Sequence, residues 1–226
     1  MTRLSGIRVC VFDAYGTLFD LATAAARCPE IPEASRAALT AVWRDKQLQY
    51  TWLRTLQDRY VDFRQVTGDA LDFALESLGL DSPGLHRRLM ALYETLDAFA
   101  EVPNVLRELR VTGFVTAILS NGSPSMLYSA IEGAGLTGLI DAVLSVDAVR
   151  AFKTHPSVYQ YALDQLGVAG REVCFQSSNA WDAYAASDFG MRVVWCNRYG
   201  QRRERLPGSP DCEIRTLSEL PALLGK

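Results

Sequence analysis

The sequence predicts a doubly wound α/β fold, with a mainly parallel sheet in the core and an inserted helical cap domain. Three observations lead to this prediction. Short apolar runs typical of buried parallel strands recur along the chain, helical patterns separate most of them, and one long stretch holds helical patterns only. The length of 226 residues suits one domain with an insertion, or two small domains.

Five apolar runs have the length expected of strands that are buried on both faces. They cover residues 7–12, 114–119, 142–146, 173–175 and 193–195. Leu106 and Leu109 indicate a helix before the second run. Another helix is expected between the third and fourth runs, where Pro156 suits a first helical turn and Gly167 suits a helix end. This alternation favours a parallel α/β sheet.

The stretch of residues 21–99 interrupts the alternation, because it holds no convincing strand. Apolar residues recur there at helical spacing in three groups, which are Trp43, Leu48, Trp52, Leu53 and Leu56, then Val66, Ala70, Phe73, Ala74 and Leu78, and, after Pro83, Leu89, Leu92, Tyr93 and Leu96. We therefore expect a core domain of residues 1–20 and 100–226 and a helical cap domain of residues 21–99. Such a cap would sit over the strand ends and could act as a lid.

Charge and hydropathy argue against nucleic-acid and membrane partners. The net charge is -3, and no basic stripe is present. One local group of arginines, Arg198, Arg202, Arg203 and Arg205, is interpreted as a solvated turn. The apolar runs are too short to span a membrane and no secretory signal is visible, so we expect a cytoplasmic protein.

Cysteine and histidine do not indicate a metal site. The five cysteines show no CxxC or Cys/His spacing. Cys10, Cys174 and Cys196 lie in strand-like apolar runs, where a structural thiol is favoured over a catalytic one. His86 and His155 are interpreted as surface residues. No cysteine or histidine is therefore assigned to a metal.

Polar residues follow the expected strands at the edge where open α/β sheets bind their ligands. They are Asp13 after the first strand, Ser120 and Asn121 after the second, Lys153 after the third, and Ser177, Ser178 and Asn179 with Asp182 after the fourth. Polar loops are common, which explains the serines and asparagines well but the aspartates and the lysine less well. We therefore predict a functional site at this edge.

The run Val11-Phe12-Asp13-Ala14-Tyr15-Gly16-Thr17-Leu18 resembles the signature of the haloacid dehalogenase superfamily. Ser120-Asn121-Gly122, Lys153 and the run Ser177-Ser178-Asn179-Ala180-Trp181-Asp182 resemble its later motifs. Residues 43–54, WRDKQLQYTWLR, are similar to the cap helix of the L-2-haloacid dehalogenases. The resemblance covers nearly the whole chain. It implies hydrolysis of small L-2-haloacids to 2-hydroxyacids and halide, without a metal or cofactor.

Tyr15 separates this sequence from the phosphatases of the superfamily. Those enzymes carry a second Asp two residues after the nucleophile, which protonates the leaving alkoxide, and they use Mg²⁺. A halide leaves without a proton and generates no multiply charged oxyanion. The missing acid therefore favours carbon–halogen chemistry over phosphoryl transfer.

The resemblance implies a mechanism in which Asp13 displaces the halide, inverts the carbon and forms an ester. Arg44 would receive the halide beside Asn121, and Ser120 with nearby amides would hold the substrate carboxylate. Further roles are implied for Lys153, which would balance Asp13 and Asp182, for Thr17 and Ser177, which would orient carboxylates, and for Asn179 and Asp182, which would position or activate water.

The resemblance also implies an apolar substrate pocket, because four residues match positions that line it in the family: Tyr15, Leu48, Phe63 and Trp181. Tyr159 would steady the lysine or the nucleophile. Taken singly, Arg44 fits a surface helix arginine better, and each apolar position is more often plain core. The prediction therefore depends on their combination. Related enzymes are often homodimers through cap helices, so a homodimer is expected here too.

Two positions depart from the family pattern. Asp45 stands where relatives often have Gln, and its carboxylate could pair with Arg44 or face solvent. Lys153 is followed by Thr154-His155-Pro156, where Pro often follows directly. A Mg²⁺-dependent phosphatase and a non-catalytic binding protein of the same fold stay open as alternatives.

Overall fold

The computed structural model describes residues 3–80 and 82–224, and in this part of the chain the core is a six-stranded sheet in the order β3-β2-β1-β4-β5-β6. The strands are β1 (Val9–Phe12), β2 (Val115–Ser120), β3 (Ala142–Ser145), β4 (Val173–Ser177), β5 (Arg192–Cys196) and β6 (Cys212–Ile214). All neighbouring strands are parallel. The predicted fold class is confirmed, and β1 lies in the middle of the sheet.

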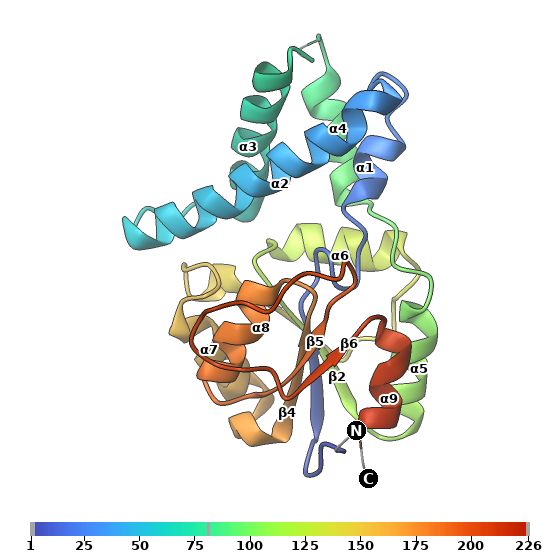
Figure 1. Cartoon of the computed structure of the whole chain (residues 1–226), viewed down its shortest axis with the longest axis vertical. Helices are drawn as coiled ribbons and strands as arrows, with labels where there is room; N and C mark the ends of the chain where they lie inside the picture. Colours follow the sequence, from blue (N-terminus) through green and yellow to red (C-terminus); the bar gives the residue numbers. More distant parts are fainter. Residues whose placement is uncertain (1–2, 81, 225–226) are drawn as a thin grey trace.

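Helices cover both faces of this sheet. They are α5 (Val102–Val111), α6 (Pro124–Gly133), α7 (Pro156–Leu166), α8 (Ala180–Asp188) and α9 (Leu220–Leu223), with short 3-10 turns at η1 (Val146–Ala148), η2 (Gly170–Glu172) and η3 (Leu217–Glu219). Figure 1 shows α5 and α9 on one side of the sheet and α7 and α8 on the other. All four residues of β1 are buried, as its continuous apolar run requires.

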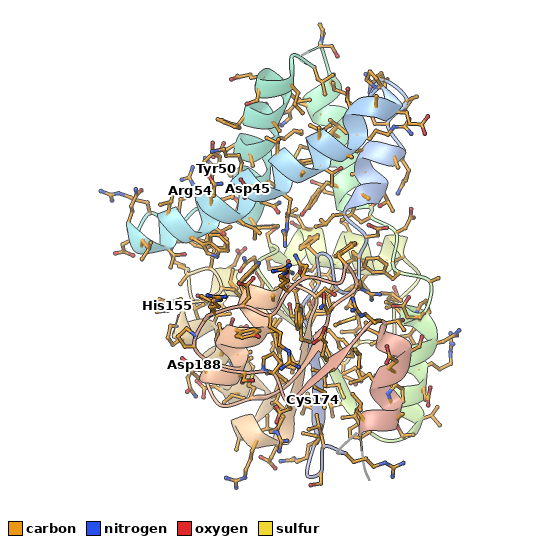
Figure 2. The ribbon with its side chains drawn as sticks, in the orientation of Figure 1. Asp45, Tyr50, Arg54, His155, Cys174 and Asp188 are labelled. Carbon is orange, nitrogen blue, oxygen red and sulfur yellow. The ribbon has the colours of Figure 1, made fainter. Side chains whose placement is uncertain are left out.

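The predicted core elements are found within one or two residues of their expected bounds. The helix α7 begins at Pro156 and ends at Leu166, where Gly167 caps it with the left-handed φ of 63° that favours glycine. The helices α6, α8 and α9 and the three-residue strand β6 were not assigned individually from the sequence. Cys174 and Cys196 are buried in the sheet as expected, and Figure 2 labels the first of them.

In the described part of the chain, the cap above the carboxyl ends of the strands consists of four helices (Figure 1). They are α1 (Ala22–Ala26), α2 (Glu33–Leu56), α3 (Phe63–Leu78) and α4 (Leu85–Glu94). The Asp62 side chain caps α3 by accepting from the backbone N–H of Gln65, and Gly79 ends it with a φ of 63°. The cap is therefore helical, as the periodicity predicts, whereas its independence as a domain with the expected boundaries stays a prediction.

Two linkers connect the cap to the core, and they run side by side. Phe19 and Ala98 form an antiparallel bridge. The N–H of Asp20 donates to the carbonyl of Asp97 at 2.9 Å, and the N–H of Phe99 donates to the carbonyl of Leu18 at 3.0 Å. These backbone bonds form the joint between the two parts.

The surface predictions have mixed outcomes. His155 is exposed at the start of α7, and the His86 side chain is 41% exposed. The prediction for Arg198 is wrong, because its side chain is only 8% exposed and contacts Glu101. Among the described residues no helix is both long and apolar enough to cross a membrane.

Candidate active site

Asp13 directly follows β1, and donors from three other segments meet its carboxylate. Its Oδ2 accepts hydrogen bonds from the Thr17 hydroxyl at 2.9 Å and from Asn179 Nδ2 at 2.8 Å. Its Oδ1 accepts from Lys153 Nζ at 3.0 Å. Asp13 is 5% exposed, so its carboxylate is held in one orientation and largely shielded from water.

Lys153 joins two carboxylates below the cap. Its Nζ donates to Asp182 Oδ2 at 2.8 Å as well as to Asp13, and the lysine is 1% exposed. The adjacent Phe152 N–H donates to the hydroxyl of Thr55 on α2 at 3.0 Å, which ties the lysine loop to the cap. The peptide bond between Lys153 and Thr154 is cis. The lysine is thus a buried ion-pair centre, not a loop charge in water.

The electrostatics of this group follow from burial and from the neighbouring charges. Burial acts to lower the pKa of Lys153, but Asp13 and Asp182 outweigh it and raise that pKa, so the ammonium stays protonated. Burial and the charge of Asp13 raise the pKa of Asp182, although Lys153 acts in the opposite direction. Burial, aided by Asp182, raises the pKa of Tyr159 well above its usual range. The Tyr159 hydroxyl therefore keeps its proton, and it donates a hydrogen bond to Asp182 Oδ1 at 2.8 Å.

A loop after β4 supports the nucleophile. The hydroxyl of Thr17 accepts from the N–H of Ser178 at 2.8 Å while it donates to Asp13. The hydroxyl of Ser177 accepts from the N–H of Asn179 at 3.1 Å and donates to the carbonyl of that residue at 3.3 Å. Ser177 therefore shapes the loop that carries Asn179, and its hydroxyl bonds to backbone and not to a carboxylate as expected.

Arg44 reaches the site from α2 in the cap. Its Nη2 donates to Asn179 Oδ1 at 3.2 Å, and its Nη1 donates to Gln47 Oε1 at 2.6 Å. Asn179 thus contacts the nucleophile with one end of its amide and the cap arginine with the other. This brings the guanidinium and the carboxylate of Asp13 to opposite sides of one small side chain.

Gln47 is a site-supporting residue that the sequence analysis missed. It is 1% exposed, and its Nε2 donates to the Thr67 hydroxyl at 2.7 Å and to the Tyr93 hydroxyl at 3.1 Å. Its place on the buried face of α2, between Trp43 and Thr51, gives no local signal for these contacts, because both partners come from other helices. Its contacts fix the arginine against α3 and α4.

The position of Asp45 answers one question that the sequence left open. Asp45 is exposed on α2, where Figure 2 labels it, and its Oδ2 accepts from Gln49 Nε2 at 2.6 Å. Arg44 bonds instead to Gln47 and Asn179. The extra carboxylate therefore faces solvent and does not pair with the arginine.

The loop after β2 lies beside the lysine loop. Asn121 Oδ1 accepts from the N–H of Lys153 at 2.9 Å, and the Ser120 hydroxyl accepts from the N–H of Gly122 at 3.0 Å. A Cβ at Gly122 would lie 2.8 Å from Cε2 of Tyr15 and 3.1 Å from its hydroxyl. Glycine is therefore required there by close approach of the tyrosine ring.

Tyr15 forms an aromatic cluster under the cap. Its ring centroid is 5.5 Å from that of Phe63 and 5.3 Å from that of Tyr93. Tyr15 is 2% exposed, and its hydroxyl has no hydrogen-bond partner among the described residues. Burial raises the pKa of Tyr15 well above its usual range, so the hydroxyl keeps its proton and remains a free donor beside Asp13 and Arg44.

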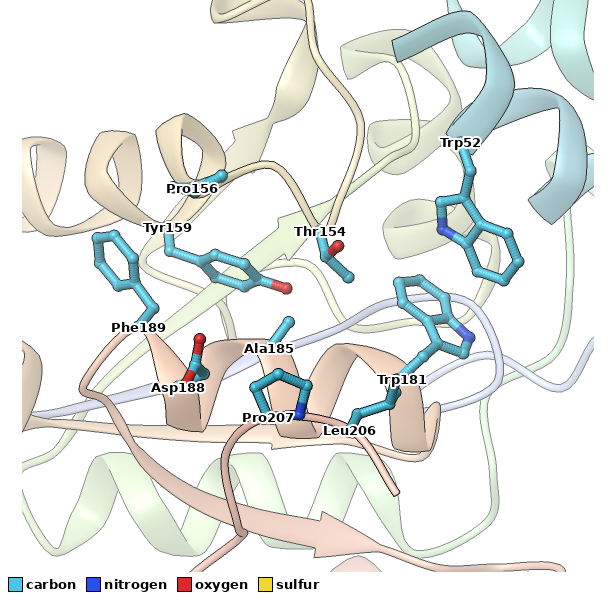
Figure 3. A pocket seen from close by; sticks show the side chains of 10 residues that line it. All are labelled: Trp52, Thr154, Pro156, Tyr159, Trp181, Ala185, Asp188, Phe189, Leu206 and Pro207. Carbon is cyan, nitrogen blue, oxygen red and sulfur yellow. The ribbon is translucent and has the colours of Figure 1, made fainter. Parts of the chain in front are cut away.

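The expected apolar pocket is divided in the structure. Tyr15 and Phe63 lie in the cluster just described, and Leu48 is half-buried on α2, one turn beyond Arg44. Trp181 instead lines a separate pocket of about 620 Å³ (Figure 3), with Tyr159 and Trp52. The rings of Trp52 and Trp181 meet edge to face, with centroids 5.5 Å apart.

The arrangement can carry out nucleophilic substitution and then hydrolysis. It presents an oriented carboxylate, a second buried carboxylate with a raised pKa, and a guanidinium across from the nucleophile. Among the described residues, no group of three or more His, Cys, Asp or Glu side chains could hold a metal ion.

Comparisons with known proteins agree with this geometry. The family described as haloacid dehalogenase-like hydrolase matches residues 7–190. The chain is 45% identical to (S)-2-haloacid dehalogenase 1 of Pseudomonas sp. (strain CBS-3), covering 96% of each chain. It is 43% identical to (S)-2-haloacid dehalogenase 4A of Burkholderia cepacia, covering 99% of this chain and 97% of that one.

Solved structures are similar as well. The L-2-haloacid dehalogenase of Xanthobacter autotrophicus with chloropropionic acid covalently bound has a TM-score of 0.90 and 37% identity, covering 96% of this chain and 98% of that chain. A dehalogenase crystal structure with an intermediate complex has a TM-score of 0.95 and 43% identity, covering 98% of both chains.

Proposed function

The chain belongs to the haloacid dehalogenase-like hydrolases, and from this premise we propose that it hydrolyses small L-2-haloacids to 2-hydroxyacids, through an ester on Asp13. The observation that carries the proposal is the setting of Asp13. Donors from Thr17, Asn179 and Lys153 aim its carboxylate, while the residue two positions later is Tyr15 and not an acid. A nucleophile without a neighbouring general acid suits a leaving group that needs no proton.

In the first step an oxygen of Asp13 attacks the halogen-bearing carbon from the side opposite the halogen. A carbon–oxygen bond forms, and the carbon–halogen bond breaks with its electron pair leaving on the halide. Oδ1 is suited to the attack, because it accepts one side-chain hydrogen bond while Oδ2 accepts two. A single displacement of this kind inverts the carbon.

Arg44 and Tyr15 stabilise the departing halide. The guanidinium of Arg44 is always cationic and presents several donors, two of which are already oriented by Gln47 and Asn179. The Tyr15 hydroxyl is a buried donor without a partner in the described protein, so a halide would satisfy it. We assign Asn121 to the halide beside Arg44, and Ser120 with the amides of its loop to the substrate carboxylate.

In the second step water attacks the Asp13 carbonyl carbon. Asp182 accepts a proton from this water, and its raised pKa makes it a better base than an ordinary carboxylate. Lys153 stabilises the oxyanion that forms on Asp13. The product leaves as an alkoxide that takes the proton from Asp182, and the Asp13 carboxyl then loses its own proton to solvent.

We also propose that the protein is a homodimer through the cap. Leu53 and Leu56 on α2 are 50% and 83% exposed, and Phe73 on α3 is 38% exposed. Sedimentation should give a dimer for the wild type and a monomer for Leu56→Glu. The control Val111→Glu changes an equally exposed residue of the core helix α5 and should remain dimeric. A monomeric wild type at micromolar concentration would contradict this. The cytoplasmic location remains a prediction.

The functional test is halide release from L- and D-2-chloropropionate. We expect release from the L-enantiomer alone, a D-2-hydroxyacid product by chiral chromatography, and no release by Asp13→Asn. Retained configuration would contradict the single displacement. Hydrolysis of a phosphate ester that depends on Mg²⁺, without halide release, would favour the phosphatase alternative.

A further inference from the structure

Arg198 follows β5 by two residues and lies where the two linkers of the cap meet the core. Its Nη2 donates to the backbone carbonyl of Thr17 at 2.8 Å, just before the first linker. Its Nη1 donates to Glu101 Oε1 at 2.6 Å, just after the second linker. The guanidinium carbon also lies 3.8 Å from the centroid of the Phe99 ring. One side chain thus contacts both linkers or their immediate neighbours.

These contacts are desolvated and therefore stronger than surface ion pairs. The side chains of Arg198 and Glu101 are 8% and 19% exposed. Burial acts to raise the pKa of Glu101, but its own backbone N–H and the guanidinium of Arg198 together hold that pKa below its usual range. The carboxylate therefore stays charged beside the arginine. By contrast, the side chain of Arg203 is 75% exposed, and its ion pair with Glu213 is longer, at 3.6 Å. Such a solvated pair contributes little.

The residue that Arg198 holds is itself part of the nucleophile's support. Thr17 donates from its hydroxyl to Asp13 and accepts there from the N–H of Ser178. A shift of the Thr17 backbone would move the hydroxyl that orients the nucleophile. The next residue, Leu18, accepts the hydrogen bond from Phe99 that pairs the two linkers.

We propose that Arg198 is a positioning residue for dehalogenation, which fixes the nucleophile loop and the cap joint together. This inference rests on the proposed function. Its guanidinium acts through Thr17 on the orientation of Asp13, and through Phe99 and Glu101 on the joint that sets the cap over the core. Cap placement matters because Arg44 lies on the cap helix α2 and its hydrogen bond to Asn179 spans from the cap to the core. A guanidinium suits this task because it combines two separate donors with a flat face for the Phe99 ring.

The test compares Arg198→Met, Arg198→Lys and the control Arg203→Met on L-2-chloropropionate. Methionine keeps the apolar stem but removes every donor, whereas lysine can reach one partner only. We expect kcat to fall at least tenfold in Arg198→Met with KM changing less than threefold, and to recover partly in Arg198→Lys. Arg203→Met should match the wild type.

Hydrogen exchange by mass spectrometry supplies a readout besides activity. In Arg198→Met the joint amides of Asp20 and Phe99 should exchange at least tenfold faster, while Val11 and Val193 in the central strands keep their wild-type rates. Equal kcat in Arg198→Met and Arg203→Met would overturn the inference, as would faster exchange spread evenly over the sheet. If Arg198→Met does not fold, Arg198→Lys decides, because wild-type kcat and joint exchange in that variant would also overturn it. A wild type that releases no halide would instead overturn the proposed function.

Discussion

Replacing Lys153 by methionine removes the ammonium between Asp13 and Asp182 and keeps a side chain of similar length. Both carboxylates stay buried, at 5% and 0% exposed, and they lose the cation that neutralises one of their charges. Breaking a buried pair by removing one partner costs about 3–5 kcal/mol. We therefore expect Lys153→Met to lower the free energy of unfolding by this amount at pH 7.5.

The destabilisation should depend on pH with a definite sign. In the wild type Lys153 already opposes the upward shift of the Asp182 pKa, so its removal raises the pKa of that carboxyl further. A folded-state pKa above the unfolded one means that the folded variant binds a proton that the unfolded chain releases. Stability is then retained at low pH and lost as the pH rises, by about 1.4 kcal/mol per pH unit for one proton. The deficit should therefore be clearly smaller at pH 5 than at pH 7.5.

Urea unfolding of wild type and variant at both pH values measures this directly. The matched control is Lys46→Met in the cap, whose ammonium donates to Gln49 and lies over the Phe73 ring. It should cost less than about 1 kcal/mol at either pH. A Lys153→Met deficit that is below 1 kcal/mol, or equal at the two pH values, would refute the account of the buried pair. Turnover of Lys153→Met should fall at least about a thousandfold, or about 4 kcal/mol of barrier.

Three further predictions concern the halide contacts of Tyr15 and Arg44 and the dependence of the reaction on metal ions. Tyr15→Phe should lower kcat/KM about tenfold, or about 1.4 kcal/mol, without loss of stability, because the deleted hydroxyl has no partner in the described protein; a stability loss above 1 kcal/mol would contradict this. Arg44→Lys should lower turnover at least about tenfold, because the oriented fork of donors is lost. Asp45→Asn should stay within twofold of wild type, because Asp45 faces solvent. Equal turnover in the two variants would remove Arg44 from the halide site. Exhaustive chelation should leave dehalogenation unchanged, because Tyr15 stands where metal-dependent relatives carry an acid; activity that is lost and then restored by Mg²⁺ would point to phosphatase-like chemistry.

The sequence predicted the meeting of Asp13, Lys153 and Asp182 because parallel topology is restrictive. Adjacent parallel strands deliver their carboxyl ends to one edge, so residues that are far apart in the chain converge once the strands are identified. The register confirms this, since Phe12 pairs with Gln176 one position before both strands reach the site. The cap helices α2, α3 and α4 were equally predictable from their apolar spacing, whereas the five-residue helix α1 was not.

Arg198 shows what local patterns cannot predict. Four arginines within eight residues are typical of a solvated turn, and only the packing of Phe99 and Glu101 buries the first of them. The same holds for Gln47, whose partners Thr67 and Tyr93 come from two other helices. In both cases the signal is a long-range contact, which neither composition nor periodicity encodes.

Two other features could not be predicted from the sequence, for related reasons. The strand β6 has three residues, too few for a period, and it follows a loop rich in arginine, glycine and proline. The pocket at Trp181 is closed on one side by Leu206 and Pro207, which belong to that same loop. Loop placement depends on tertiary packing more than on local preference, so a sequence pattern does not predict such walls.

The central claim is that Asp13 attacks carbon, and a single turnover in ¹⁸O water with enzyme in excess tests it most directly. One oxygen of Asp13 becomes bonded to the substrate, and water then attacks the Asp13 carbonyl carbon. The hydroxyacid should therefore leave almost unlabelled, and the label should appear in the tryptic peptide of residues 9–27, at Asp13 and not at Asp20 after fragmentation. A fully labelled product with an unlabelled peptide would mean that water attacks the substrate directly, and it would contradict the ester on Asp13 even if halide were still released.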